Sequence, residues 1–276
     1  MPPSMSGDVE MSDVDQILQS GDFADVCQQL DGLNGNLDPS LIKRLITFIK
    51  NGEQAEAVRQ KAAEALGRGN TEDSKSALIN LSENNSEKVR GLSAIGLGED
   101  RSLESRARLI ELLADANNNV RNLAERSLLQ MEDLLGEHLQ ELLALLEHPV
   151  PLTRSPAARL LGKSGRTEAR EPLTGHLQQD GQWLVRMWSA KALGDLGDKA
   201  ASPALIQSLQ TDERNRVRAA AAEAVGKLRP DGVETILRQA LETDEDGGVR
   251  KLASEALQAL GHAIDDVETD PFAEDD

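Results

Sequence analysis

An arginine recurs along this chain at a spacing that suits charge pairing between repeated elements. Successive copies lie 31, 31, 33, 32, 32 and 32 residues apart. The seven arginines are Arg59, Arg90, Arg121, Arg154, Arg186, Arg218 and Arg250. Six positions before them stand Glu53, Asn84, Asp115, His148, Asp180, Asp212 and Asp244. A guanidinium and a carboxylate form strong paired hydrogen bonds. We therefore predict a structural ladder in which each arginine bonds the acid of its own turn and the turn of the next repeat.

Residues that carry catalysis or bind metals are sparse. The four histidines (His138, His148, His176 and His262) share no repeat position, and no two of them have the i, i+3 or i, i+4 spacing of helical metal ligands. Phosphate-binding glycine loops and the GxSxG nucleophile motif are absent from the sequence. The single cysteine, Cys27, stands near Phe23, Val26 and Leu30 and is expected in the core. The sequence predicts no catalytic residue, no cofactor and no metal site.

A basic side chain stands five residues after the repeated arginine in three consecutive copies. These residues are Arg126, Arg159 and Lys191, and Lys163 follows Arg159 by one helical turn. At 100° per residue the position faces solvent, opposite the apolar arc. We call Arg126, Arg159, Lys163 and Lys191 the basic strip and predict that it binds an acidic or phosphorylated segment of a protein partner. The alternative is a set of solvated charges that pair with neighbouring glutamates.

Two tryptophans lie close to the strip in sequence. Trp183 stands three residues before Arg186, where most copies have a polar residue, and we predict that it anchors a partner near the rim of the strip. Trp188 takes a position where three other copies have leucine, which predicts packing against the neighbouring helix.

The elements that position these residues are pairs of helices. Each arginine opens an alanine-rich stretch that ends in Leu-Gly or a close variant, as in VRQKAAEALG and VRMWSAKALG. Segments such as RARLIELL and PALIQSL, with leucine and isoleucine at helical spacing, lie between these stretches. A lone helix pair cannot bury its apolar face, so the fixed period indicates a stacked array. We predict an all-α solenoid of about seven two-helix repeats over residues 37–264.

Acidic residues are concentrated at the ends of the chain. The net charge of the chain is −18. Seven acidic residues lie in residues 1–33 and seven in residues 265–276, and neither stretch contains a lysine or arginine. We predict an acidic N-terminal segment with a capping helix over residues 1–36 and a disordered acidic tail over residues 265–276. The acidity disfavours nucleic-acid binding, and no apolar run or basic leader predicts membrane insertion or secretion. We expect a cytoplasmic protein.

The fourth copy departs from the pattern. It reads EHPVPLTRSPAARLLG, with Pro149, Pro151 and Pro156, and His148 replaces the acid of the turn. Three prolines here are expected to reshape the turn between the two helices.

The D-x5-R turn and the VR-x2-AA-x-ALG helix resemble HEAT-like repeats, specifically the short subclass found in phycobilisome bilin lyases. The resemblance covers residues 37–264 and implies a helical solenoid, and our leading interpretation is a non-enzymatic adaptor that holds one or more protein partners. Similar acidic prokaryotic proteins include adaptors of archaeal signalling, among them taxis adaptors. The alternative that the resemblance offers is a bilin lyase-like subunit acting on a tetrapyrrole–protein substrate. Deoxyhypusine hydroxylases, which hold iron through His-Glu dyads, are a poor match because the sequence contains no His-Glu dipeptide.

Overall fold

The computed structural model describes residues 23–35 and 37–262, and this part of the chain is built from helices without a strand. The all-α solenoid of paired helices is confirmed. Residues 1–22 and the predicted acidic tail at 265–276 lie outside the described residues. Contacts divide the chain into two compact units at Gln130 and Met131.

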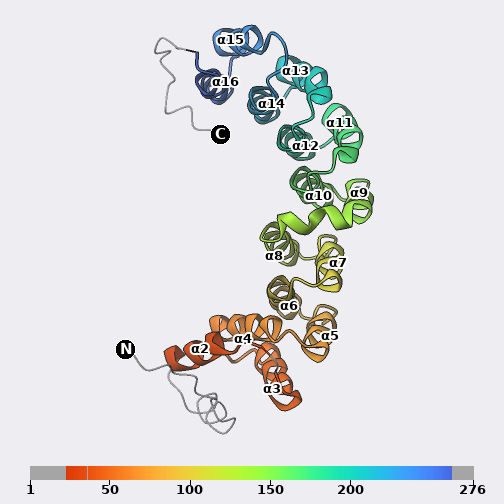
Figure 1. The fold of residues 1–276 in the computed structure, drawn as a ribbon, viewed down its shortest axis with the longest axis vertical. Helices are drawn as coiled ribbons and strands as arrows, with labels where there is room; N and C mark the ends of the chain where they lie inside the picture. The colour runs from red at the N-terminus through yellow and green to blue at the C-terminus, as the bar shows by residue number, and fades with distance from the viewer. Residues whose placement is uncertain (1–22, 36, 263–276) are drawn as a thin grey trace, which may run out of the picture. The chain divides into compact units, whose positions relative to one another are not determined.

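Unit 1 contains α2 and three helix pairs. Its helices are α2 (Phe23–Gly32), α3 (Pro39–Lys50), α4 (Glu56–Arg68), α5 (Glu72–Leu81), α6 (Glu87–Asp100), α7 (Leu103–Leu112) and α8 (Asn118–Leu129). The second helices of the pairs, α4, α6 and α8, stack on one another, and α2 packs on α4 (Figure 1). Cys27, which the sequence places in the core, is only half-buried on this terminal helix.

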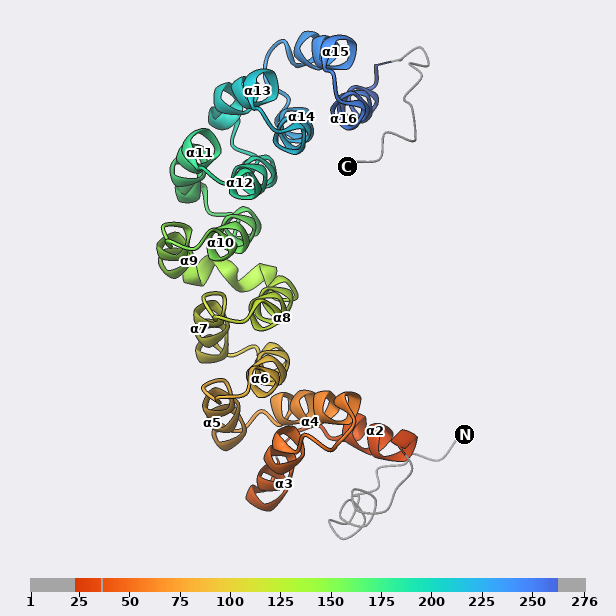
Figure 2. The ribbon, with the colours of Figure 1, turned by 180° about the vertical axis from the view of Figure 1, so that it is seen from behind.

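Unit 2 contains four helix pairs and three short 3-10 segments. Its elements are η1 (Glu132–His138), α9 (Leu139–Leu146), α10 (Pro151–Lys163), η2 (Thr167–Ala169), α11 (Arg170–Gln179), α12 (Trp183–Leu196), η3 (Lys199–Ala201), α13 (Ser202–Thr211), α14 (Asn215–Leu228), α15 (Val233–Thr243) and α16 (Gly247–Ala259). Figure 2 shows α10, α12, α14 and α16 in one row and α9, α11, α13 and α15 in a second row.

Glycine allows the second helices to approach closely. A Cβ atom on Gly162 would lie 2.5 Å from the Cα of Ala192, and one on Gly194 would lie 2.9 Å from the Cα of Ala224. In both contacts the glycine eight residues after one ladder arginine meets the alanine six residues after the next. The stacking register of α10, α12 and α14 is therefore constant. Buried leucine, valine and alanine side chains fill the core around these contacts.

The prolines of the fourth copy leave the second helix continuous. The α9–α10 turn has four residues, 147–150, between the three of the α11–α12 turn, 180–182, and the five of the α7–α8 turn, 113–117, which contains no proline, so turn length does not single out this copy. Pro151 occupies the first turn of α10, where its missing N–H costs no hydrogen bond. Pro156 is buried inside α10, which runs on to Lys163.

Candidate functional site

Three of the four ladder arginines of unit 2 bond two consecutive repeats. Arg186 donates from Nε and Nη2 to the Asp212 carboxylate of the next repeat, at 2.8 and 3.0 Å. Its Nη1 donates to the backbone carbonyl of Asp180 in its own turn, at 2.9 Å. Arg154 and Arg218 repeat the pattern with Asp180 and Asp244 as their carboxylate partners. In unit 1, Arg90 bonds Asp115 in the same way.

This pairing corrects one part of the predicted ladder. The acid of an arginine's own turn contributes its backbone carbonyl to that arginine, while its carboxylate bonds the preceding repeat. Each carboxylate also accepts the N–H two residues later, as Asp180 does from Gln182 at 2.9 Å. This local bond orients the carboxylate at the start of the second helix, where both of its oxygens accept from the preceding arginine: Asp180 Oδ1 accepts from Gln182 N and Arg154 Nη2, and Oδ2 accepts from Arg154 Nε.

Three ladder arginines form no hydrogen bond with a carboxylate of the next repeat within residues 23–35 and 37–262. Arg59 donates to the carbonyl of Ile49, and Arg250 donates to the carbonyls of Asp244 and Glu245. Arg121 donates to the carbonyls of its own turn, and its Nε is buried without a hydrogen-bond partner among the described residues. The repeat after Arg121 in sequence has His148 in place of the acid.

Ionic bonding shifts the pKa values along the ladder. Burial raises the pKa of the Asp180 carboxyl, but hydrogen bonds from Arg154, from the Gln182 N–H and from His176 outweigh burial and hold the pKa below its usual range. The hydrogen bond from Arg90 likewise lowers the pKa of Asp115. Both carboxylates stay ionised, as a structural charge pair requires.

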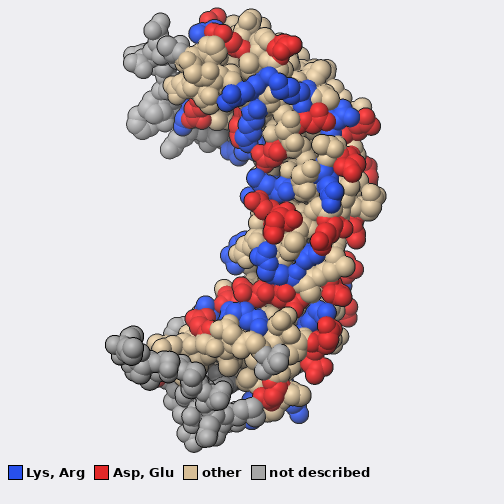
Figure 3. Space-filling model, viewed as in Figure 1, with Lys and Arg blue, Asp and Glu red and all other residues tan. Residues whose placement is uncertain are grey.

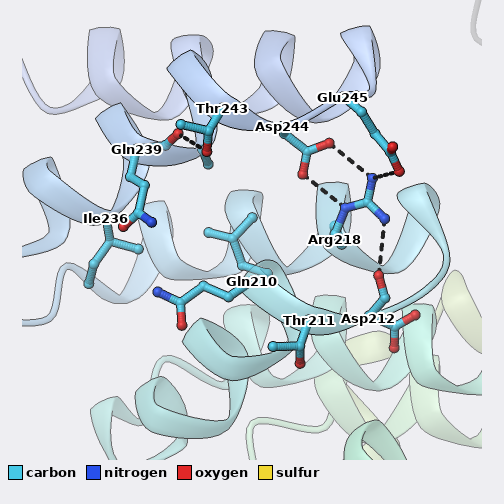
Figure 4. A pocket seen from close by; sticks show the side chains of 11 residues that line it. Gln210, Thr211, Asp212, Arg218, Ile236, Gln239, Thr243, Asp244 and Glu245 are labelled. Carbon is cyan, nitrogen blue, oxygen red and sulfur yellow. Dashed lines mark hydrogen bonds and ion pairs between the residues drawn. The ribbon is translucent and has the colours of Figure 1, made fainter.

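Open cavities follow the ladder between the first helices of neighbouring repeats. The one drawn in Figure 4 has a volume of about 320 Å³ and is lined by Arg218, Asp244, Glu245 and Gln210 among others. Figure 4 shows the Arg218 guanidinium directed at the Asp244 and Glu245 carboxylates. Because these carboxylates already take up its donors, the cavity offers no free cation to an anionic ligand.

His176 joins the ladder in a way that the sequence did not reveal. Its Nδ1 lies 3.0 Å from Asp180 Oδ2, and its Nε2 lies 3.1 Å from Glu147 Oε1 in the preceding repeat. These residues line a cavity of about 500 Å³ together with His148 and Arg154. The i, i+4 spacing of His176 and Asp180 is the sequence feature that could have predicted their contact. Among the described residues no cluster of three metal-ligating side chains occurs.

Two residues of the basic strip contact the ring of Trp188. The guanidinium carbon of Arg159 lies 4.7 Å from the Trp188 ring centroid, and Lys191 Nζ lies 5.5 Å from it. Cations over an indole face are attracted by the ring quadrupole. Trp188 is half-buried. The sequence predicted that it packs against the neighbouring helix, and the structure adds contacts with two basic side chains.

A network of ion pairs continues the strip across α10, α12 and α14. Lys163 lies 3.1 Å from Asp195, and Lys191 lies 3.8 Å from Glu223. Lys227 joins both acids, at 2.9 Å from Asp195 and 2.8 Å from Glu223. Several strip charges are thus paired, as the alternative interpretation expects. Three lysines of the network thus share two carboxylates.

The remaining predicted site residues lie in different places. Trp183 is half-buried at the start of α12, with the Arg216 guanidinium carbon 5.7 Å from its ring centroid. Arg126 is exposed on α8 and belongs to unit 1, whereas the other strip residues belong to unit 2. The face drawn in Figure 3 carries acidic and basic side chains interspersed over both units. Among the described residues no helix is long and apolar enough to cross a membrane.

Known proteins resemble this chain in its repeats and its fold. The family model for HEAT repeats matches residues 139–226 and, overlapping them, residues 203–271. No curated protein matches the chain. Kap95p, in a structure with RanGDP, is 15% identical with a TM-score of 0.61 over 91% of this chain and 40% of Kap95p.

Two further solved structures show the same fold. The karyopherin Kap121p, bound to the extreme C-terminus of the protein phosphatase Cdc14p, is 14% identical with a TM-score of 0.61 over 91% of this chain and 33% of that chain. The Escherichia coli protein YibA is 18% identical with a TM-score of 0.52 over 92% of this chain and 93% of its own. At these identities the likeness concerns the fold alone.

Proposed function

We propose that this chain, whose residues 139–271 match the family model for HEAT repeats, is a non-enzymatic adaptor that holds one or more protein partners. The observation that carries the proposal is the stack of Arg159 and Lys191 on Trp188, which brings cations from α10 and α12 together with an aromatic ring in unit 2. Arginine and tryptophan are the side chains most enriched where partners bind tightly. The proposed partner segment is acidic or phosphorylated and contacts Arg159, Lys163 and Lys191, with Trp183 at the rim, while Arg126, the remaining predicted strip residue, belongs to unit 1.

The fold neighbours support a binding role in general terms. Kap121p is bound to the extreme C-terminus of Cdc14p in its structure, and Kap95p is bound to RanGDP in its own. Stacked helical repeats offer extended surfaces for such contacts. The proposal extends to a cytoplasmic role in prokaryotic signalling such as taxis, on the resemblance to acidic archaeal adaptors and to the short repeat subclass.

The test is affinity capture with matched charge variants. The bait chain is used as wild type, as the reversal Arg126→Glu/Arg159→Glu/Lys191→Glu, and as the control reversal Lys43→Glu/Lys88→Glu/Lys199→Glu. The control lysines are exposed on other elements, and both triple variants change the net charge equally. Proteins from the native host that the wild type and the control retain, and the strip reversal loses, are the expected partners. If all three baits retain the same proteins, the partner does not bind at the strip.

The proposal that the chain has no enzymatic activity has its own assay. Purified chain, alone and with a partner lyase chain, is mixed with a bilin and a phycobiliprotein apo-subunit. We expect no chromophore attachment above the uncatalysed background. Attachment faster than this background would contradict the adaptor proposal and support the bilin lyase-like alternative.

A further inference from the structure

Two histidines with different hydrogen-bonding roles line the cavity of about 500 Å³ beside the α9–α10 turn of unit 2. His148 lies in the turn, and its Nδ1 accepts the backbone N–H of Val150 at 3.1 Å. His176 lies on α11, with Nδ1 3.0 Å from a carboxylate oxygen of Asp180 and Nε2 3.1 Å from one of Glu147. The two rings therefore need different protonation states.

The bond between His148 and Val150 requires a neutral His148 ring. A backbone N–H can only donate, so Nδ1 of His148 must offer a lone pair and cannot carry a proton. An earlier repeat makes the same bond with a side chain that does not titrate, because Asn84 Oδ1 accepts the N–H of Ser86 at 2.9 Å. Protonation of His148 therefore removes the bond that holds the backbone just before α10.

The two contacts of His176 require a protonated ring. A carboxylate oxygen accepts hydrogen bonds, whereas a neutral imidazole carries one N–H and an imidazolium carries two. In the neutral ring a nitrogen lone pair would face one of the two carboxylates. Asp180 keeps its fork from Arg154 in either state, and its side chain is 2% exposed, whereas that of Glu147 is 73% exposed. Glu147 is therefore the carboxylate that the neutral ring releases.

The charges that face His176 balance when its ring is protonated. Glu147 in the turn and Asp180 at the end of α11 supply two negative charges, and Arg154 on α10 supplies one positive charge. Arg186 on α12 donates to the backbone carbonyl of Asp180. With one protonated ring the charges that line the cavity sum to zero. A second protonated ring would leave a positive charge without a carboxylate, and two neutral rings would leave a carboxylate without a cation.

We propose that His148 and His176 form a pH-sensitive latch on the α9–α10 turn. The latch is closed while His176 is protonated and His148 is neutral. A rise in pH releases Glu147, and a fall in pH releases the N–H of Val150. Histidine is the side chain that ordinarily changes charge between pH 5 and 8. The turn carries the exposed side chain of Val150, and Leu152 follows it at 49% exposure, so the latch controls how firmly these apolar side chains are held. This inference goes beyond the adaptor proposal and does not rest on it.

Hydrogen–deuterium exchange of the full chain tests the latch at the amides of residues 147–150. Wild type, Glu147→Ala and His148→Asn are compared at pH 5.0, 6.5 and 8.5, each at the same pH so that intrinsic exchange rates cancel. Glu147→Ala should exchange about two- to fivefold faster than wild type at pH 6.5, as expected for a partly exposed ion pair, and equally fast at pH 8.5. His148→Asn retains the acceptor, as Asn84 does. It should exchange about two- to tenfold more slowly than wild type at pH 5.0.

Glu234→Ala is the matched control, because Glu234 contacts a different histidine, His262, at 3.3 Å. It should leave the exchange of the turn unchanged at every pH, and circular dichroism at each pH shows that the variants are folded. A difference between Glu147→Ala and wild type that is as large at pH 8.5 as at pH 6.5 overturns the latch, as does equal exchange of His148→Asn and wild type at pH 5.0. The measurement uses the chain without a partner, so failure of the latch leaves the adaptor proposal standing.

Discussion

Arg186 and Asp212 are 26 residues apart in the chain and form a two-bond fork between adjacent repeats, with N···O distances of 2.8 and 3.0 Å. Their side chains are 10% and 8% exposed, so water screens the pair weakly. Because Arg186 also holds the carbonyl of Asp180, one side chain ties two consecutive turns together. The hydrogen bond to Asp212 raises the pKa of Arg186 and keeps it charged throughout the ordinary pH range.

Replacing Arg218 by alanine should destabilise unit 2. The Asp244 carboxylate loses its fork and the Asp212 carbonyl loses its donor, at a cost of about 1–3 kcal/mol in the free energy of unfolding. Arg250→Ala is the matched control, because the bonds recorded for Arg250 are to backbone carbonyls. Urea denaturation should show the larger loss for Arg218→Ala. Equal losses would mean that the carboxylate fork adds nothing.

Acid should weaken the ladder through Asp180. Its folded-state pKa lies below the unfolded value of about 3.9. The stability it contributes is therefore present above that unfolded value and is lost as pH falls through the folded pKa. Asp180→Asn should reduce stability at pH 7 and flatten the fall in stability below about pH 4. Urea midpoints measured from pH 7 to pH 2.5 test this, with Asp231→Asn, an exposed turn residue, as the control.

Gly162→Ala should separate α10 from α12. The added Cβ would lie 2.5 Å from a backbone atom of Ala192, which cannot rotate away, and overpacking of this kind costs about 1–3 kcal/mol. Gly175→Ala is the opposite change on α11, where a Cβ meets nothing within 4 Å. It should stabilise the chain by about 0.5–1 kcal/mol through helix propensity. Thermal melting that moves the same way in both variants contradicts the close-approach argument.

Reversing Arg159 and Lys191 to glutamate should abolish partner binding and should also lower the melting temperature modestly, because both cations are lost from the Trp188 ring and a glutamate at position 191 would face Glu223. Charges near the surface contribute under about 1 kcal/mol each to folding, whereas they steer and orient a charged partner strongly. Wild-type binding should also weaken as salt rises, since the screening length is about 10 Å at 0.1 M. Titrations from 50 to 500 mM NaCl measure this slope. A salt-independent affinity would show that the strip makes no ionic contact with the partner.

The tertiary structure assigned the partners that a one-dimensional pattern leaves open. The sequence predicted that Arg186 bonds an acid. It could not decide between the carboxylate of Asp180, six residues before Arg186, and that of Asp212, 26 residues after it. Stacking decides, because Asp180 turns its carboxylate to the preceding repeat. The same holds for Trp188, whose leucine-like position indicated packing without showing Arg159 and Lys191 on its ring.

What the sequence alone determined is the repeated unit: its period, its two helices, its buried alanine and leucine face and its ladder residues. These follow from local physics, since helix propensity and the 3.6-residue period act within one repeat. The tertiary structure decided which repeats share a unit, and it assigned Arg126 to a different unit from the rest of the strip. It also decided that Trp183 contacts Arg216. Those relationships depend on how one repeat packs on the next, and packing joins residues about 30 positions apart that no local periodicity connects.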